Sequence, residues 1–584
     1  MSNKYLALTL GPIYQTLLKP RRTREAWAAS YVFSWIMKEI VQRLLHPKAG
    51  PVIVAREDFI LPFFSAENGT FAEKSGVGIW PDRLIVRAKG GEFEQLKRIV
   101  REVIEELARQ THEEFVRPDK ARYLEREFGF VAPPDPGEIE SHFQHYFRAA
   151  FLEVEEKDLP AEGDSFVKQI NFLLDHLELS APLAALEPDY VTYLLRAVHR
   201  SFLIQNAFHS RWNFESLIEV ATSDLRLVDA NRYTAIVEAD FEQRDRKGRG
   251  EEQDLLDRLA EVPDFKKVLS TYHRYIAIVH ADGDQIGKLL GKLGADAAAV
   301  QAFSLDLFEF GKAANRILAG DRHTAKPASY GYGAAPLYLG GDDLVFFAPV
   351  ARRDPRTDRL ETIFHLLSQL DQAFQQIFQK YAALDVRPTL SYGVSISYYK
   401  YPLQEALQVS RKLLAAVKQD KPEFETRNRI HFRLLKHSGQ HFGGILDKNG
   451  KLLYPLWFEV LNANLKTLNR KKQPTAAVLA GVAHKLDLIE PMIRAVIARD
   501  VAREAAASEG QKVGDYASLL HPLFFNQFDE AVHRTGKKGE ELHPFLIHVM
   551  EFIGASRLQT GTPDLDLTYA LLRFIHFLNS REDA

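Results

Sequence analysis

Two apolar segments that each run into acidic residues constrain this chain more than any other feature. Residues 276–284 (IAIVHADGD) look like a buried strand that ends in carboxylates, and residues 337–347 (LYLGGDDLVFF) place Gly-Gly-Asp-Asp where a tight hairpin would turn. Two such strands side by side would gather three or four carboxylates at one point. Because Mg²⁺ prefers oxygen ligands, this pattern predicts a two-metal site of the kind that transfers nucleotides.

Each half of the pattern is a weak signal by itself. Asp282 and Asp284 precede an expected helix, where carboxylates are also stable as N-caps, and Gly-Gly-Asp-Asp suits an ordinary turn. Together, however, carboxylates at the rim of a core raise one another's pKa, and a divalent cation, Mg²⁺ or Mn²⁺, relieves that cost. We therefore expect Asp284 to support the metal ligands from behind or to cap the helix. The residues assigned to catalysis and metal binding are Asp282, Asp342 and Asp343, with Gly283 at the same metal site.

The same region is expected to bind a nucleoside triphosphate. One metal ion would activate a ribose hydroxyl and the other would clamp the triphosphate. The amides of Gln285–Gly287 can receive phosphate oxygens, and Gly340 and Gly341 let a base and ribose lie close to the backbone. Lys288 and Lys418 could add positive charge, although an ordinary surface lysine explains each equally well. The predicted nucleotide-binding residues of this region are Gly283, Gln285, Ile286, Gly287, Lys288, Gly340, Gly341 and Lys418.

Composition narrows the class of protein. A chain of 584 residues is too long for one core and suggests about three to five domains. A formal net charge of −3 excludes a uniformly basic nucleic-acid coat, and the lack of cysteine excludes disulfides, zinc ribbons, iron–sulfur clusters and cysteine nucleophiles. We find no signal peptide and no apolar run of ~20 residues. We therefore expect a soluble cytoplasmic protein without a membrane segment.

The expected elements alternate between two α/β units and two helical stretches. The first unit is predicted as strand 4–10, helix 23–45, strands 51–55 and 83–87, and helix 92–115. Mostly helix follows over 120–230, then a strand at 233–239 and a charged loop at 243–253. The second unit is predicted as strand 275–281, helix 285–318, strands 336–340 and 344–348, helix 357–382, strand 388–398, helix 402–419 and a closing strand 429–435. From residue 442 the chain is expected to be helical, with a loop at 534–541.

This order predicts a multidomain α+β protein in which two ferredoxin-like palm domains are interleaved with two mostly helical domains. The recurring order of elements suggests an internal duplication, although only the second unit carries the paired carboxylates. The expected domains are a first palm over 1–120, a helical domain with linker over 121–262, a second palm over 263–440 and a C-terminal helical domain over 441–584.

Several motifs occur in the order of a known family. In the second palm they are residues 280–288 (HADGDQIGK), 339–344 (LGGDDL), 391–395 (SYGVS), 401–406 (YPLQEA) and 437–439 (HSG). In the first palm they are residues 10–13 (LGPI), 21–31 (RRTREAWAASY) and 78–84 (GIWPDRL). With these motifs the chain resembles the large, polymerase/cyclase-like subunit of type III CRISPR effector complexes, with most similarity to the Cmr-type (III-B) branch.

The resemblance implies two palms that face each other, each holding one nucleotide. When target RNA binds, the second palm would join ATP through 3′–5′ bonds into cyclic oligoadenylates. The resemblance also implies assembly with other effector subunits and a CRISPR RNA. In the first palm, segments 21–30 and 81–83 are expected to shape a nucleotide pocket, although the arginines of 21–24 could equally face solvent or RNA. The predicted residues of this pocket are Arg22, Ser30, Asp82 and Arg83.

The chain departs from the family pattern in two ways. Many members begin with an HD nuclease domain, but here the first palm starts at Met1 and no His-Asp dipeptide occurs, so we expect no DNA cleavage. The zinc-binding cysteines of many relatives are also missing, which puts a metal beyond the catalytic site in doubt.

Three alternatives remain open at this stage. Some members without the HD domain join ATP to S-adenosylmethionine and make a SAM–AMP conjugate, whose acceptor pocket would lie near Asp58, Glu67 or Asp82. A catalytically silent scaffold would have no need for the carboxylate cluster. A diguanylate-cyclase-like enzyme shares the hairpin motif but fits two palms and long helical domains less well.

Overall fold

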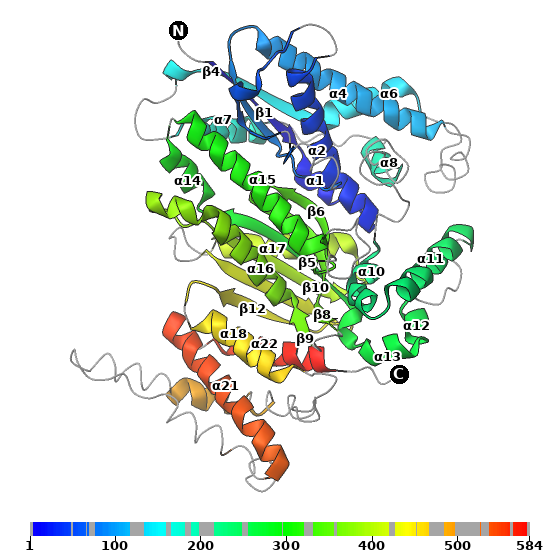
Figure 1. Cartoon of the computed structure of the whole chain (residues 1–584), viewed down its shortest axis with the longest axis vertical. Helices are drawn as coiled ribbons and strands as arrows, with labels where there is room; N and C mark the ends of the chain where they lie inside the picture. The colour runs from blue at the N-terminus through cyan, green and yellow to red at the C-terminus, as the bar shows by residue number, and fades with distance from the viewer. Residues whose placement is uncertain are drawn as a thin grey trace, which may run out of the picture.

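The computed structural model describes two large β-sheets and a small two-stranded one, with helices packed around them (Figure 1). The described residues are 4–47, 51–65, 67–68, 76–116, 134–158, 165–180, 189–197, 215–247, 255–294, 296–320, 331–354, 359–419, 427–450, 452–465, 484–486, 488–496, 526, 536–560 and 564–580. None of the helices within these ranges is long and apolar enough to cross a membrane.

The first sheet has the topology of a ferredoxin-like fold. Its strands are β1 (Lys4–Gly11), β2 (Phe59–Leu61), β3 (Arg83–Ala88) and β4 (Arg148–Glu155), and its two crossing helices are α2 (Thr23–Leu45) and α4 (Glu92–Phe115). The strand order is β2-β3-β1-β4, and all neighbours are antiparallel. This is the β-α-β-β-α-β arrangement that the sequence predicts.

The second sheet repeats this topology and then extends it. The repeated elements are β5 (Tyr275–Asp284), α14 (Ile286–Leu293), α15 (Ala297–Ala319), β6 (Ala335–Gly340), β7 (Asp343–Pro349), α16 (Ile363–Phe378) and β10 (Thr389–Tyr398). Their order β10-β5-β7-β6 corresponds strand by strand to β4-β1-β3-β2. The extension consists of α17 (Leu403–Gln419), β11 (Arg429–Leu435) and β12 (His441–Asp447), with β11 parallel to β10. The shared topology supports the expected duplication.

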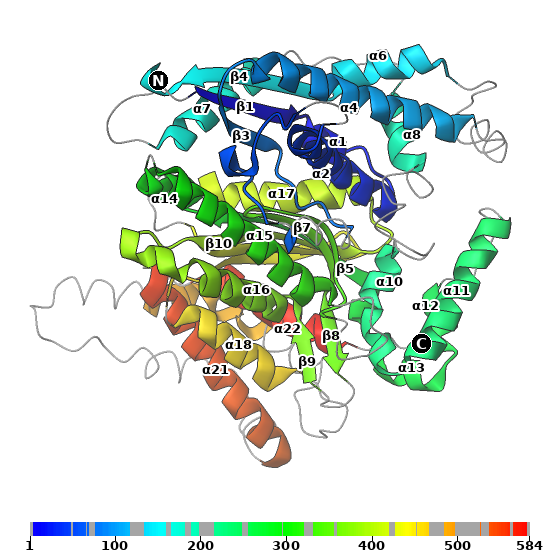
Figure 2. The ribbon, with the colours of Figure 1, turned by 45° about the horizontal axis from the view of Figure 1, so that its top comes forward.

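Successive residues of β10 show how the second sheet is covered. Tyr392 donates its hydroxyl to Asp371 of α16 at 2.9 Å, whereas a Cβ added to the next residue, Gly393, would lie 2.1 Å from the Ser410 carbonyl of α17. Because neighbouring residues of a strand point to opposite faces, α16 and α17 cover opposite faces of the sheet. Figure 2 shows α17 on the side that faces the first palm.

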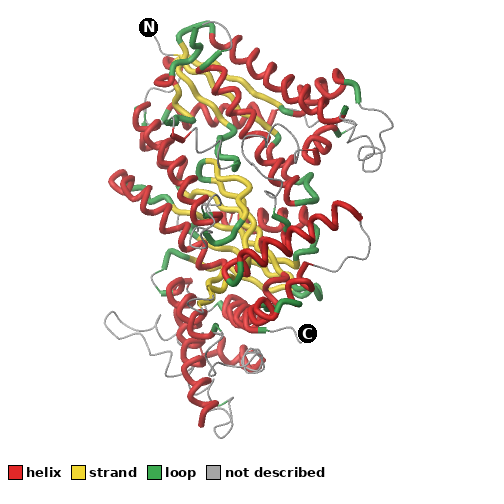
Figure 3. Tube along the Cα trace, turned by 45° about the vertical axis from the view of Figure 1, so that its right-hand side comes forward, coloured by secondary structure: helices red, strands yellow, loops and turns green. Residues whose placement is uncertain are grey.

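The remaining elements surround the two palms. They are α1 (Ile13–Leu17), α6 (Pro136–Tyr146), α7 (Phe166–Ser180), α8 (Tyr190–Ala197), α10 (Leu217–Ala221), α11 (Ala230–Lys247), α12 (Leu255–Ala260), α13 (Pro263–Val268), β8 (Ala351–Asp354), β9 (Arg359–Thr362), α18 (Leu453–Asn464), α21 (Gly536–Thr560) and α22 (Leu565–Asn579). One apolar core runs through both palms and the C-terminal helices, and a smaller one lies within α10–α13. In Figure 3 the sheet of the first palm lies above that of the second, and helices surround both.

Helices 23–45 and 92–115 are confirmed at their predicted bounds, but several other elements differ. The predicted strand 51–55 is irregular, and the short β2 takes its place in the sheet. Within the expected helical stretch, β4 is a partly exposed edge strand without a clear alternation of buried residues, which is why it was missed. The predicted strand 233–239 lies in α11, where Tyr233, Val237 and Asp240 are buried at helical spacing.

Other differences follow from local breaks in the chain. Helix α11 runs to Lys247 through the start of the expected loop 243–253. The expected helix 285–318 is divided, because Gly294 has a φ of 67° and Asp296 caps α15 by accepting from the Ala298 and Ala299 amides. The expected helix 357–382 begins only at Ile363, after the β8–β9 hairpin, and ends in a 3₁₀ turn.

Two expectations for the C-terminal region are also wrong. Strand β12 follows β11, so β11 does not close the sheet. A Cβ added to Gly443 of β12 would lie 2.0 Å from the Phe432 carbonyl, so the glycine that weakens the strand signal is what allows the pairing. The expected loop 534–541 is helical from Gly536 onward, as the first turns of α21.

Candidate nucleotide site

The acidic site lies where β5 ends beside the β6–β7 hairpin. Strands β5 and β7 are antiparallel neighbours with Ala281 opposite Leu344, so the end of β5 lies against the start of β7. The hairpin pairs Gly340 with Asp343 and turns through two residues, the first of which, Gly341, has a φ of 71°. Such a turn requires a left-handed residue at this position, which favours glycine. The predicted tight hairpin is confirmed.

Gly283 lies directly against Asp342. A Cβ added to Gly283 would lie 2.6 Å from Oδ2 and 2.7 Å from Cβ of Asp342, closer than two such atoms approach. Only a residue without a side chain therefore lets β5 and the hairpin meet at this distance. The contact places Asp342 beside Gly283, the residue that follows Asp282. The negative charges of Asp282 and Asp342 are therefore concentrated at one point.

The carboxylates of this cluster are electrostatically strained. Burial, and then the charge of Asp282, raise the pKa of Asp342 to about 7, against the lowering effect of backbone hydrogen bonds at Asp342 and Gly283. Burial also raises the pKa of Asp282, and Lys418 counteracts this because its ammonium group forms an ion pair with Asp282. The helix-terminal lysine that the sequence singled out therefore reaches the cluster.

Asp343 differs from its neighbours because its side chain is exposed at the turn. The protein packed around it, and then the charges of Asp282 and Asp342, raise its pKa as well, although water at the exposed carboxylate weakens the effect. Within the described residues, no three His, Cys, Asp or Glu side chains are arranged so that they would hold a metal ion. Asp282 is instead engaged by Lys418. The donor set, all oxygen and with incompletely neutralised charge, is nevertheless of the kind that suits Mg²⁺.

The first palm docks on the strand that leads into the hairpin. The Leu339 amide of β6 donates to the Gly78 carbonyl at 2.8 Å, and Ser30 of α2 donates its hydroxyl to the Leu337 carbonyl at 2.9 Å. The Tyr338 ring lies between Gly78 and Gly340, because a Cβ added to either glycine would contact that ring. The hydroxyl of Ser30 is thus used to join the two palms.

Asp82 is the first-palm residue that the structure brings to the acidic cluster. Its charge is among those that raise the pKa of Tyr338 and of Asp343. By contrast, Arg83 forms an ion pair with Asp175 of α7, and Arg22 is the exposed residue that precedes α2. Of the predicted first-palm pocket, the structure therefore groups Asp82 and Ser30 near the hairpin and directs Arg83 elsewhere.

The start of α14 is less regular than a simple phosphate-binding helix end. Gln285 has a φ of 65°, its side chain makes no capping hydrogen bond, and the helix begins at Ile286. Ile286 packs toward Gly283, while Gly287 and Lys288 are exposed. Asp284 does not cap the helix; its fully buried carboxylate is turned into the sheet.

Sequence reasoning missed two residues that belong to the site. Tyr338 lies beneath the hairpin and carried no signal beyond its place in a β-strand. Arg427, which follows residues outside the described ranges, lowers the pKa of Asp282 through its charge. Its neighbour Asn428 has a φ of 65°, and an Asn before a strand was the one signal available.

The fold and the site define a protein with two ferredoxin-like palm units, the second of which carries an acidic hairpin. Residues 275–431 match the family model described as Cas10/Cmr2, second palm domain, and residues 5–117 match the one described as CRISPR-associated protein Cmr2, N-terminal. The chain belongs to this family of large subunits of type III CRISPR complexes.

Solved structures with a similar fold include two complexes of a Csm1-Csm4 cassette. The complex with cA4 is 11% identical, with a TM-score of 0.45, and the match covers 99% of this chain and 70% of that chain. The complex with pppApApA is 12% identical, with a TM-score of 0.47, and the match covers 99% of this chain and 69% of that chain. No curated protein matches the chain.

Proposed function

We propose that this chain is the nucleotidyltransferase of a type III CRISPR effector complex and makes cyclic oligoadenylates from ATP when target RNA binds. The observation that carries the proposal is the meeting of Asp282, Gly283 and Asp342 at the ends of neighbouring strands, with exposed Asp343 beside them. Membership in the Cas10/Cmr2 family supports it. In this complex the chain would work with other effector subunits, a CRISPR RNA and the target RNA.

The residues of the cluster divide the work. Asp282, Asp342 and Asp343 would hold divalent cations, which supply activation of a ribose hydroxyl and neutralisation of the triphosphate. Gly283 keeps Asp342 in place, and Gly341 leaves the backbone open to a nucleotide, whereas Gly340 makes room for the Tyr338 ring. Lys418, already at the cluster, supplies a positive charge for phosphate oxygens. Tyr338 of the second palm and Asp82 of the first would border the side of the cluster where the palms meet, and the second nucleotide would lie there.

One observation keeps S-adenosylmethionine as an alternative second substrate. Of the three acidic residues suggested for its pocket, Asp58 is paired with Lys89 at 3.0 Å and Glu67 is exposed 3.8 Å from Lys312. Asp82 instead lies among the charges of the site. A sulfonium or ammonium group of the acceptor would be attracted to it.

The assignment is tested with the assembled complex, labelled ATP, Mg²⁺ and target RNA. We expect Asp342→Ala/Asp343→Ala to abolish product formation while the complex still assembles, because the cluster loses most of its ligands. A control variant, Asp264→Ala/Glu309→Ala, removes two exposed carboxylates elsewhere and should retain activity. Retained synthesis in the double hairpin variant would refute the catalytic assignment.

Mass spectrometry of the products identifies the reaction. Cyclic oligoadenylate from ATP alone supports the proposal, whereas a conjugate that forms only with S-adenosylmethionine supports the alternative. Product from GTP rather than ATP would indicate a diguanylate-cyclase-like enzyme. If the wild-type complex makes no product at all, the chain is a scaffold.

A further inference from the structure

A buried polar cluster behind the acidic site has no part in the assignment above. Asp284 is 0% exposed, and its Oδ2 accepts hydrogen bonds from Thr389 and Ser391, each at 2.8 Å, and from the Asn428 amide at 3.0 Å. Its Oδ1 is buried without a hydrogen-bond partner among the described residues. Burying a carboxylate costs free energy unless hydrogen bonds or opposite charges compensate for the lost water. The three donors that converge on Oδ2 provide this compensation.

The contact fixes the point at which the chain returns to the sheet after α17. The Asn428 carbonyl accepts from the Lys448 amide at 3.0 Å, and its side chain donates to Asn449 at 3.1 Å. Asn449 in turn donates to the Arg427 carbonyl at 2.6 Å. Arg427 and Asn428 are therefore held through both their main chain and a side chain, and Asn428 adopts the left-handed conformation.

The base of this cluster is itself rigid. Lys448 donates to both carboxylate oxygens of Asp371, at 2.7 and 2.8 Å, and to the Leu390 carbonyl at 2.8 Å. Leu390 lies between Thr389 and Ser391, whose side chains donate to Asp284. The Asp371–Lys448 pair therefore holds the strand from which these two side chains project. With a side-chain exposure of 3%, Lys448 is removed from water, and the pair is fixed in one geometry.

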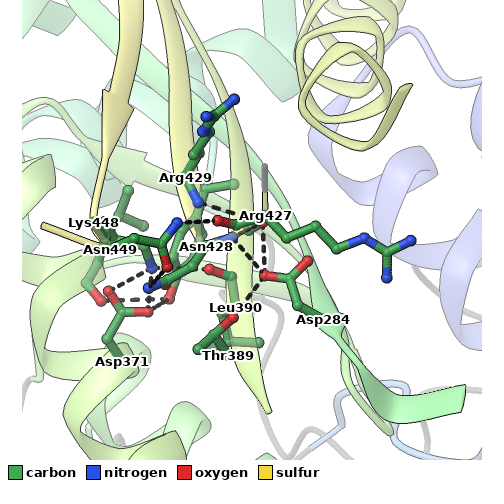
Figure 4. Close-up of polar contacts among 12 residues, drawn as sticks. Asp284, Asp371, Thr389, Leu390, Arg427, Asn428, Arg429, Lys448 and Asn449 are labelled. Atoms are coloured by element: carbon green, nitrogen blue, oxygen red, sulfur yellow. Dashed lines mark hydrogen bonds and ion pairs between the residues drawn. The ribbon is translucent and has the colours of Figure 1, made fainter. Parts of the chain in front are cut away.

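The cluster directs Arg427 toward the acidic site. Figure 4 shows the Arg427 side chain extending past Asp284 and away from the Asp371–Lys448 pair. Its charge acts on Asp282, the residue with which Lys418 forms an ion pair. Lys418 and Arg427 thus stand at the two ends of the segment that joins α17 to β11; Lys418 pairs with Asp282, and the charge of Arg427 lowers the pKa of the same carboxylate.

We propose that Asp284 is a positioning residue that, through the main chain of Asn428, holds Arg427 at the acidic cluster, where Arg427 and Lys418 together bind the phosphates of the nucleotide. This inference rests on the proposed function. The planar fork of an arginine matches two phosphate oxygens at once, whereas a lysine provides a single charge. Together the two residues supply the positive charge that a triphosphate needs beside a cluster of carboxylates.

The test measures binding instead of catalysis, with the full chain, a non-hydrolysable ATP analogue and adenosine. Arg427→Met should weaken binding of the analogue roughly 10- to 100-fold, the range for a lost charged hydrogen bond, and leave adenosine binding unchanged. Arg429→Met is the matched control, because Arg429 is nearby but pairs with Asp447 at 3.3 Å. It should bind both ligands as the wild type does.

The role of Asp284 is separated from general damage by a double-mutant cycle. Asp284→Ala should weaken analogue binding about as much as Arg427→Met, and the combined variant should bind no more weakly than Arg427→Met alone. Asp284→Asn retains an oxygen acceptor and should restore analogue binding to within about threefold of the wild type.

Additive effects in the cycle, equal loss of adenosine binding, or unchanged binding by Arg427→Met would each overturn the proposal. A wild-type chain that binds no ATP analogue would overturn the proposed function itself, and this inference with it. Analogue binding that depends on Lys418 but not on Arg427 leaves the proposed function standing and refutes only the inference.

Discussion

Single residues set the geometry of the acidic cluster, and the smallest of them matters as much as the carboxylates. Gly283 is in contact with Asp342 at a distance that no side chain would allow. Its role is steric, since the position of Asp342 relative to Asp282 depends on how closely β5 and the hairpin approach. A shift of about 1 Å at a reacting centre typically lowers the rate about 100-fold.

Gly283→Ala is therefore expected to reduce product formation at least about 100-fold. The added Cβ would push Asp342 away and leave the remaining fold intact, because β5 stays paired on both sides. Gly291→Ala is the control, since the nearest atom to its added Cβ is Lys168 Cδ at 4.0 Å. Initial rates of the two variants, with circular dichroism to monitor folding, check this; equal rates would contradict the steric role.

At this scale the sequence predicted which carboxylates would meet and singled out Lys418, which pairs with Asp282, but it did not indicate Arg427. Asp282 and Asp342 come together because their strands are adjacent, and adjacency follows from the predicted order of elements. The partner of Arg83, Asp175, lies on α7, 92 positions further along, and no local pattern indicates it. The roles of these residues in catalysis stay predictions.

At the scale of whole elements, the N-terminus of α16 shows how β9 passes directly into a helix. Thr362 and His365 form a capping box, in which the Thr362 amide donates to His365 Nδ1 at 3.0 Å. The other ring nitrogen, Nε2, lies 3.0 Å from Asn462 of α18. The neutral ring with its proton on Nε2 satisfies both partners, so this histidine joins two helices.

The capping box predicts a pH dependence of stability. Burial disfavours the charged ring and so lowers the pKa of His365 below its usual 6.5, and a proton on Nδ1 would replace the acceptor that the Thr362 amide uses. The stabilisation by the neutral ring is thus complete above pH 6.5 and is lost as the pH falls through the lowered pKa. His365→Gln keeps an acceptor at the capping position without titrating there. Between pH 7 and pH 5 the thermal midpoint of the wild type should fall more steeply than that of His365→Gln. The difference should correspond to about 1 kcal/mol in the free energy of unfolding. Parallel curves would refute this.

Elements were predictable where a single pattern dominated. Helix α4 has a strong apolar stripe, and its predicted bounds are confirmed. The segment 233–239 contains β-branched residues that favour a strand, but it packs Tyr233 and Val237 into the small helical core, where helical spacing buries them. Tertiary packing therefore overrode local preference, which no reading of the segment alone could show.

For the whole molecule, the decisive relation is between the two palms. Ser30 and Leu337 are 307 positions apart in sequence and share a hydrogen bond. The duplication was visible in the sequence as a repeated order of elements. How one palm docks on the other depends on how their surfaces fit, and no periodicity or motif spacing in a single sequence indicates that. The docking places Gly78 and Asp82 on the side of the hairpin that the second nucleotide would occupy.

Separating the palms should therefore slow synthesis without unfolding either of them. A Cβ added to Gly78 would lie 3.3 Å from the Tyr338 ring and 3.4 Å from Ser30 Oγ, so a leucine there cannot fit without moving the first palm off β6. We expect Gly78→Leu to lower the rate of synthesis about tenfold or more while the second palm still binds one ATP analogue. Gly554→Leu adds the same side chain to α21, where no atom lies within 4 Å of the added Cβ, and should leave the rate unchanged. Measuring both the rate and the binding tests whether synthesis depends on the docking of the palms. A normal rate in Gly78→Leu would mean that the second palm works without the first palm docked at its hairpin.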